Sequence, residues 1–202
     1  IVVRLVGSEM CIRDSAKTGH EKREEPLGIG MMFLPRNDYV ALEKCRTIIE
    51  SELLDHGYYI YGWRQVPINN SVIGEKANST RPEIEQVMFV NNIERGKNFD
   101  YSKELYLVRR RLEKRIAKQQ INGFYVCSLS FESIIYKGLF LAEQLSIFYP
   151  DLANESFVSS YAVFHQRYST NTFPSWGLAQ PFRMLAHNGE INTISGLSLI
   201  HI

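Results

Sequence analysis

The chain has 202 residues, of which 45% are hydrophobic and 22% charged, and its formal net charge is +1. These values are typical of a globular protein with one sizeable core, and they give no bias toward nucleic acid or a membrane surface. No apolar run approaches the ~20 residues of a membrane helix, so we expect no transmembrane segment. The three cysteines, Cys11, Cys45 and Cys127, are widely spaced. This spacing argues against a disulfide framework or a zinc site and favours a reducing compartment.

The two ends of the sequence differ from the rest. Residues 1–15 show no helix cap, no clean periodicity and no turn signal. Their amino-acid sequence, like that of residues 197–202, resembles translated sequencing adapters. We therefore expect both segments to be non-native, with residues 1–15 packing poorly and residues 16–26 acting as a linker. Residues 27–196 are then expected to carry the fold.

Apolar runs and helical periodicity alternate through the first half of this region. Residues 27–35 form a continuous apolar run closed by a proline, which predicts a buried strand. Residues 36–57 have the spacing of a helix that Asn37 or Asp38 caps and Gly57 ends. An aromatic-rich strand, a loop and a further strand are expected next, at 58–63, 64–82 and 83–90.

A second long helix is expected at residues 100–119. Apolar side chains recur along one face of it, at Leu105, Val108, Leu112 and Ile116. Its other face carries the run RRRLEKR, which glutamates interrupt, so a solvated face is favoured over a nucleic-acid patch. Two neighbouring antiparallel strands, a short helix and a last strand follow at 124–130, 133–138, 141–149 and 161–169. Cys45 and Cys127 are expected in the core, and the mixture predicts an α+β fold.

Two stretches near the C-terminus could carry chemistry. Arg167 is expected at the end of the last strand, where a guanidinium can hold a carboxylate through two charge-assisted hydrogen bonds, and Thr170 adds a hydroxyl nearby. From spacing alone, an ordinary surface arginine is the better interpretation. Asn188 and Gly189 offer a side-chain amide and a backbone N–H that can converge on an oxygen that becomes negative in acyl transfer. A tight turn explains this Asn-Gly pair equally well.

Both stretches lie in residues 165–193, HQRYSTNTFPSWGLAQPFRMLAHNGEINT. This sequence closely resembles the glutaminase domain of the glutamate synthase large chain, a class II glutamine amidotransferase. The likeness covers residues 27–196 through GIGMMFLP, YGWRQVPIN, YLVRRRLE, FYVCSLS and YKGLFLAEQLSIFYPDL. Other class II amidotransferases share the Arg-x-x-Thr and His-Asn-Gly elements, whereas TNTFPSWxLAQPFR is particular to glutamate synthase. The resemblance implies the four-layer α/β/β/α N-terminal nucleophile hydrolase fold, incomplete at both ends.

The resemblance also implies roles for these residues. Arg167 would grip the α-carboxylate of L-glutamine, with Thr170 lining the same pocket, and Asn188 and Gly189 would form the oxyanion hole. The family's nucleophile is a cysteine at the mature N-terminus, which we expect this chain to lack. Cys11 is rejected because Ile, Arg and Asp follow it, where the family has a small, glycine-containing apolar strand. The polypeptide alone is therefore expected to be inactive.

The implied activity is hydrolysis of L-glutamine to glutamate and ammonia, with transfer of the ammonia to 2-oxoglutarate elsewhere in the same chain. No metal or cofactor is expected within these residues, since FMN and an iron–sulfur cluster belong to the family's later domains. The expected partners are the remaining synthase domains and either a small subunit or ferredoxin, without nucleic acid or membrane, in the cytoplasm or a plastid. Two alternatives stay open: another class II amidotransferase, or a non-catalytic remnant that at most binds glutamine.

Overall fold

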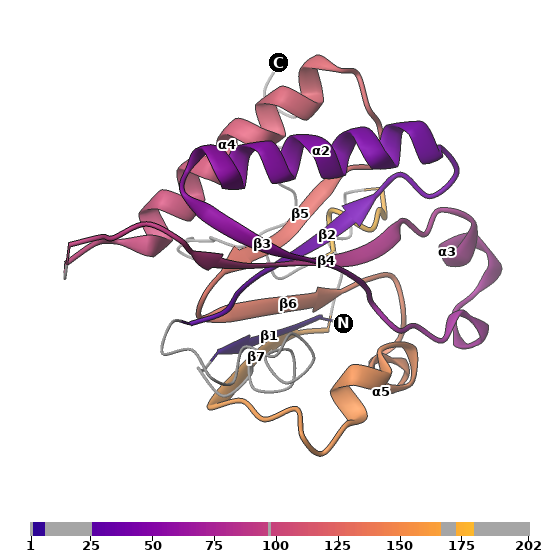
Figure 1. Ribbon diagram of the computed structural model, residues 1–202. Helices are drawn as coiled ribbons and strands as arrows, with labels where there is room; N and C mark the ends of the chain where they lie inside the picture. Colours follow the sequence, from indigo (N-terminus) through magenta and orange to yellow (C-terminus); the bar gives the residue numbers. More distant parts are fainter. Residues whose placement is uncertain (1, 7–25, 97, 167–172, 180–202) are drawn as a thin grey trace, which may run out of the picture.

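The computed structural model describes residues 2–6, 26–96, 98–166 and 173–179 (Figure 1). In these residues, two long helices, a four-stranded sheet and a three-stranded sheet are stacked as successive layers. Every strand pairing in the two sheets is antiparallel. This mixed content confirms the expected α+β class.

The larger sheet has the strand order β3-β4-β2-β5. Its strands are β2 Gly28–Leu34, β3 Tyr58–Gln65, β4 Glu83–Asn91 and β5 Tyr125–Ser130. The two central strands, β2 and β4, are buried along almost their whole length because layers cover both faces of the sheet. The continuous apolar run at residues 27–35 predicted the burial of β2, whereas residues 83–90 were expected only to form a strand.

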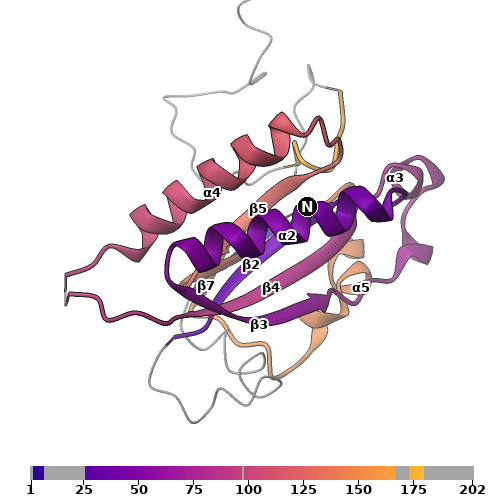
Figure 2. The same ribbon diagram turned by 45° about the horizontal axis from the view of Figure 1, so that its top comes forward.

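Two helices, α2 Tyr39–Asp55 and α4 Tyr101–Lys118, cover one face of this sheet (Figure 2). The carboxylates of Asp38 and Asp100 cap them by accepting hydrogen bonds from backbone N–H groups of the first turn. The chain leaves α2 through Gly57, whose φ of 78° suits glycine. The buried residues of α4 are the four that the periodicity predicted, Leu105, Val108, Leu112 and Ile116. No helix within the described ranges is both long enough and apolar enough to cross a membrane.

The smaller sheet has the order β6-β1-β7, with β6 Ser133–Lys137, β1 Val2–Val6 and β7 Tyr161–His165. Residues 2–6, part of the segment expected to pack poorly, form the central strand β1 and pair on both sides, while the packing of their side chains stays a prediction. Its valines are β-branched and favour strands, so this stretch supplies a strand despite its unusual wording. The non-native origin of the segment stays a prediction.

The expected pairing of β5 with β6 is wrong, since the two strands lie in different sheets. Serine hydroxyls at the connection explain the change. The Oγ atom of Ser130 accepts hydrogen bonds from the N–H groups of Glu132 and Ser133, at 3.0 and 3.2 Å. The Oγ atom of Ser128 accepts the N–H of Ile135 at 3.2 Å. These bonds occupy backbone donors that a hairpin ladder would need, and the chain passes from one layer to the next.

The connections contain short helices. The expected loop at 64–82 includes η3 Asn70–Val72 and α3 Glu75–Ser79, which are too short for periodicity to mark. The helix expected at 141–149 is present as a series of short turns, η4 Ala142–Gln144, α5 Leu145–Phe148 and η5 Pro150–Ala153. The strand expected at 161–169 ends at His165 as β7, and residues 167–169 lie outside the described residues.

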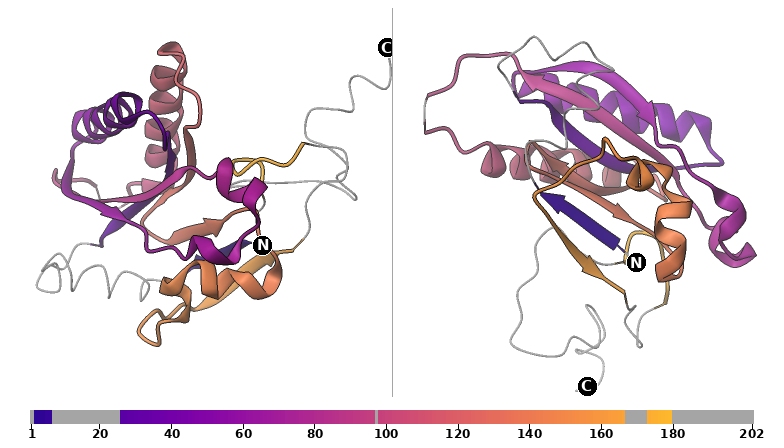
Figure 3. Two further views of the ribbon diagram at one scale, coloured as in Figure 1. Left: turned by 90° about the vertical axis from the view of Figure 1, so that its right-hand side faces the viewer. Right: turned by 90° about the horizontal axis from the view of Figure 1, so that it is seen from below.

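Two large apolar clusters lie one on each face of the larger sheet, and a small third cluster contains Leu27, Met88 and Val90. The first lies between that sheet and the long helices, and it contains Cys45. The second lies between the two sheets and contains Cys127 and Trp176. Figure 3 shows the long helices on one side of the larger sheet, with α5 and the smaller sheet on the other. The prediction that both cysteines pack in the core is confirmed.

Candidate functional site

The site residues expected from the sequence lie outside the described residues. They are Arg167, Thr170, Asn188 and Gly189, and Cys11 also falls outside. Two described features flank them. Strand β7 leads to the first pair, and residues 173–179 connect the first pair to the second.

The C-terminal ends of β6 and β7 lie at the same edge of the smaller sheet. Val2 of β1 pairs with Lys137 of β6 on one side and with His165 of β7 on the other. Since β1 is antiparallel to both neighbours, β6 and β7 run in the same direction, and their ends are about 10 Å apart. The chain therefore leaves β7 toward Arg167 at the edge where Lys137 ends β6.

Lys137 anchors the segment 173–179 to this edge. Its side chain is buried, and its Nζ atom donates hydrogen bonds to the carbonyl oxygens of Gly177 at 2.7 Å and Ala179 at 2.9 Å. The same ammonium lies 4.0 Å from the centre of the Tyr125 ring. Charge-assisted hydrogen bonds and the ring face compensate the loss of water around the charge.

Trp176 fixes the segment against other elements. Its indole Nε1 donates a hydrogen bond to the carbonyl of Ala77 in α3 at 3.0 Å, and its ring packs edge-on against Phe33 of β2. Gly138 allows this packing, because a Cβ atom there would lie 2.5 Å from the Trp176 ring. Contacts from α3, β2 and the residue after β6 therefore hold the tryptophan in the core.

Sequence reasoning missed both anchors. Lys137 ends an otherwise apolar strand, SIIYK, and a lysine in a buried strand is a signal that could have drawn attention to it. Trp176 stands among turn residues, where a large aromatic side chain needs a core to fill.

The described cysteines do not supply a nucleophile or a cluster site. Cys45 and Cys127 are both buried and belong to separate cores. Burial raises the pKa of the Cys45 thiol to about 11, so it stays protonated at neutral pH, whereas the thiolate is the reactive form. An iron–sulfur cluster needs several converging thiolates, which these two do not provide. Within the described ranges, no three His, Cys, Asp or Glu side chains gather to hold a metal ion.

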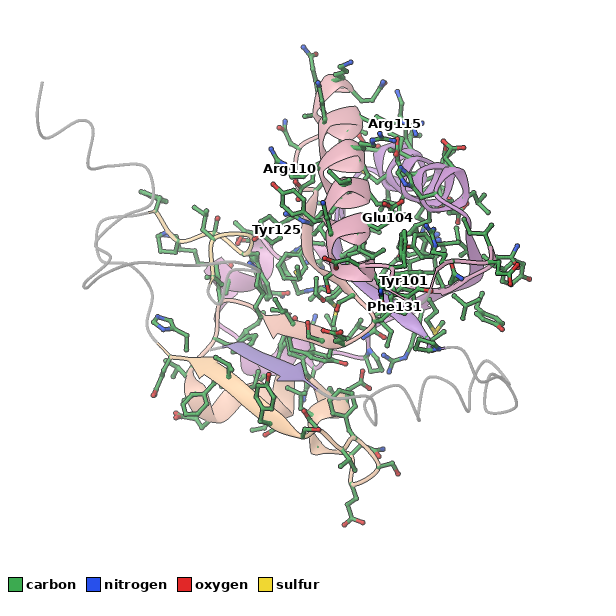
Figure 4. The ribbon with its side chains drawn as sticks, turned by 90° about the vertical axis from the view of Figure 1, so that its left-hand side faces the viewer. Tyr101, Glu104, Arg110, Arg115, Tyr125 and Phe131 are labelled. Atoms are coloured by element: carbon green, nitrogen blue, oxygen red, sulfur yellow. The ribbon has the colours of Figure 1, made fainter. Side chains whose placement is uncertain are left out.

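The arginines of α4, of which Figure 4 labels Arg110 and Arg115, pair with acidic side chains. Arg109 and Arg110 each pair with Glu113, at 2.9 and 3.0 Å. Arg115 pairs with Glu52 of α2 at 2.7 Å. These contacts support the interpretation of RRRLEKR as a solvated helix face rather than a nucleic-acid patch.

Comparison with known proteins agrees with the resemblance found in the sequence. Residues 6–199 match the family described as "Glutamine amidotransferases class-II". The large chain of NADPH glutamate synthase from Azospirillum brasilense is 62% identical over 179 residues, which are 88% of this chain and 12% of that protein. The chloroplastic ferredoxin-dependent glutamate synthase of Spinacia oleracea is 46% identical over 170 residues, which are 84% of this chain and 10% of that protein. The chain thus spans about a tenth of the length of these curated relatives.

Proposed function

This chain belongs to the class II glutamine amidotransferases, and from that premise we propose that it is the glutaminase portion of a glutamate synthase large chain. In that role the complete domain hydrolyses L-glutamine to glutamate and ammonia, and another part of the same synthase chain adds the ammonia to 2-oxoglutarate. The observation that carries the proposal is the 62% identity, over 88% of the chain, to a glutamate synthase large chain. An amidotransferase with a different acceptor is the less favoured alternative, because that identity extends far beyond the short motifs that the whole family shares.

Four residues carry the proposed site. Arg167 and Thr170 hold the α-carboxylate of L-glutamine, and Asn188 and Gly189 donate hydrogen bonds to the oxyanion. The segment 173–179 lies between the two pairs in the sequence, and a buried lysine and a buried tryptophan fix it in place.

The chemistry proposed is nucleophilic acyl transfer. A cysteine thiolate adds to the amide carbon of glutamine, and the negative charge moves to the former carbonyl oxygen, where Asn188 and Gly189 stabilise it. The amide nitrogen takes a proton and leaves as ammonia, and water then cleaves the thioester to release glutamate. The thiol is a residue other than Cys45 and Cys127, because both of these are buried in the core.

We also propose that the complete domain is the four-layer α/β/β/α N-terminal nucleophile hydrolase fold. Apolar side chains on one face of β7 support this, since Tyr161 is 58% and Val163 49% exposed. In the view from below in Figure 3, β7, β1 and α5 lie on the side away from the long helices. A further helical layer from elsewhere in the chain would cover such apolar surface.

The proposed partners follow from the same assignment. The remaining synthase domains would hold FMN and the iron–sulfur cluster, and electrons would come from a small subunit or from ferredoxin. Relatives named as NADPH-dependent and as ferredoxin-dependent enzymes support both electron donors. The compartment proposed is the cytoplasm or, as for the chloroplastic relatives, a plastid.

The test separates binding from chemistry in the full-length synthase chain that contains this sequence. Arg167→Lys keeps the charge but loses the two-pronged geometry, so the KM for glutamine should rise more than kcat falls. Asn188→Ala should lower kcat by about 10²–10³ with little change in KM, because the amide acts once the oxygen is anionic.

Synthesis from added ammonia serves as the internal control, since it bypasses the glutaminase site and should survive both changes. Arg110→Lys, on the exposed face of α4, should leave the glutamine kinetics unchanged. If Asn188→Ala kept the glutamine-dependent kcat within about twofold of wild type, the assignment of Asn188 to the oxyanion hole would be wrong. Asn188 and Gly189 would then form only a turn.

A further inference from the structure

A cavity of about 840 Å³ opens where β2 ends, and two arginines stand in its wall. Arg36 follows β2, and Arg81 follows α3. The loop before β5 and the segment 175–178 close the other sides. The volume lies within the range of roughly 300–1,000 Å³ that small-molecule sites occupy.

Arg81 is buried without an acidic partner. Its side chain is 8% exposed, and its Nη1 atom donates only to the carbonyl of the adjacent Pro82, at 3.0 Å. The Nε atom is buried and has no hydrogen-bond partner. Within the described part of the chain, no carboxylate forms an ion pair with this guanidinium. The side chain of Glu83, two residues along, instead accepts a hydrogen bond from Gln65 at 2.6 Å.

Arg36 brings a second positive charge to the same place. Its Nη1 atom donates to the carbonyl oxygen of Asn78 at 3.0 Å, and that oxygen also accepts the backbone N–H of Arg81 at 3.2 Å. Burial, and after it the charge of Arg36, lowers the pKa of the Arg81 guanidinium. Asp38 also lines the cavity, but its carboxylate accepts a hydrogen bond from the first turn of α2.

An aromatic wall lies in the same cavity. The half-buried rings of Phe124 and Tyr125 form this wall, whereas Phe33 and Trp176, which also border the cavity, are buried in the core. The cavity therefore combines two cationic groups with apolar ring surface. This combination suits a molecule that has an anionic end and an apolar body.

We propose that this cavity binds a small organic anion, whose carboxylate or phosphate group contacts Arg81 and Arg36 and whose planar apolar body lies against the aromatic wall. A buried guanidinium without an acidic partner is costly, and buried donors without hydrogen bonds, such as the Nε atom of Arg81, are rare. An oxyanion satisfies the Arg81 guanidinium best, because two guanidinium N–H groups can donate to two oxygens of a carboxylate or phosphate. The inference does not depend on the proposed glutaminase activity, since none of its residues belongs to the expected glutamine site.

Calorimetric titration of the full-length chain with three probes tests the proposal. Benzoate and phenyl phosphate carry the two head groups on the same planar body, and acetate carries the head group alone. At least one aromatic probe should bind saturably and about tenfold or more tightly than acetate. The tighter aromatic probe identifies the head group that the site prefers. Arg81→Gln should weaken that binding about tenfold, and Arg81→Lys should weaken it less because the charge remains.

Arg36 provides an independent variant, since its exposed side chain makes Arg36→Gln safe for folding. We expect this change to weaken binding of the aromatic probe at least about threefold, because one of the two positive charges is lost. Arg110→Gln removes an exposed arginine that does not line the cavity and should leave binding unchanged. The proposal is wrong if neither aromatic probe binds saturably, or if Arg36→Gln binds as tightly as wild type.

Discussion

Arg64 and Asp151 form a two-pronged ion pair that connects β3 to the helical turn η5. The Nη1–Oδ2 and Nη2–Oδ1 distances are 2.8 and 2.7 Å, and the Asp151 side chain is 2% exposed. Gln86 accepts a further hydrogen bond from Arg64 at 2.7 Å, and the hydroxyl of Tyr136 donates to Asp151 at 3.2 Å. Gln86 lies in β4 and Tyr136 in β6, so the network joins the two sheets to the turns beside them.

Replacing Asp151 with Asn should destabilise the protein strongly. The variant keeps the size of the side chain but leaves the Arg64 guanidinium without its charged partner in a buried site. Breaking a buried pair from one side costs about 3–5 kcal/mol. Urea unfolding followed by circular dichroism measures the loss of unfolding free energy.

The exposed pair of Arg110 with Glu113 provides the control for this experiment. Arg110 has 61% of its side chain exposed, and exposed pairs contribute about 0–1 kcal/mol. Arg110→Gln should therefore change the unfolding free energy by less than about 0.5 kcal/mol. If Asp151→Asn were equally mild, the buried pair would contribute no more than a surface one.

Local patterns in the sequence predicted the long helices and the central strands. The period of Leu105, Val108, Leu112 and Ile116 identifies the buried face of α4, because one helical face must pack on the sheet. The sequence also marked the start of α2, with Asn37 or Asp38 as its cap, and the structure has Asp38, whose carboxylate accepts a hydrogen bond from a free N–H group of the first turn.

Long-range contacts were not predictable in this way. Whether β5 and β6 share a sheet depends on serine hydroxyls that compete for backbone donors, and neither hydrophobic period nor spacing reports that competition. The burial of Lys137 depends on carbonyl groups of Gly177 and Ala179, which are far along the chain. The cavity arginines were missed for the same reason, because nothing in the local pattern of Arg81 marks it as buried.

The thiol of Cys45 should make stability fall with pH in the alkaline range. Burial raises its pKa from 9.0 to about 11. Between these pH values the unfolded chain loses the thiol proton and the folded chain keeps it. The contribution of the Cys45 thiol to the free energy of unfolding is therefore complete below pH 9 and decreases above it. The expected decrease is about 1 kcal/mol by pH 10.

Cys45→Ala isolates this effect. The variant has a lower stability at every pH because a small cavity replaces the thiol, but its decrease between pH 8 and pH 10 should be smaller than that of wild type by about 1 kcal/mol. Burial also raises the pKa of Tyr58, to about 12, so the comparison is kept at or below pH 10. Identical pH profiles for the two proteins would show that the thiol does not contribute.

Gly138 should not tolerate alanine. A Cβ atom there would lie 2.5 Å from both the Phe140 and Trp176 rings, so these side chains would have to move within a packed core. Overpacking of this kind costs about 1–3 kcal/mol, which thermal unfolding measures. Gly96→Ala is the matched control, because a Cβ atom there meets nothing within 4 Å, and a change below about 0.5 kcal/mol is expected. Equal stability of the two variants would mean that the rings yield without cost.

Lys137→Met should loosen the segment 173–179 while leaving the rest of the fold in place. The methionine fills similar space but cannot donate, so the carbonyls of Gly177 and Ala179 lose a buried charged donor. Leaving such groups unsatisfied costs about 1–3 kcal/mol. The amides of Leu178 and Ala179 make turn hydrogen bonds of 3.2 and 3.4 Å within the segment, and their hydrogen exchange should accelerate about tenfold or more.

Two comparisons separate this local effect from a general loss of stability. Exchange in the core of α4, at Val108 and Leu112, should change only as far as global unfolding does, because these residues do not contact the segment. Lys76→Met removes an exposed ammonium that lies 5.9 Å from the Phe173 ring, and it should leave the exchange of Leu178 unchanged. If Lys137→Met accelerated exchange equally in α4 and in the segment, the lysine would support the whole fold. If exchange in the segment did not change, Trp176 alone would be sufficient to hold it.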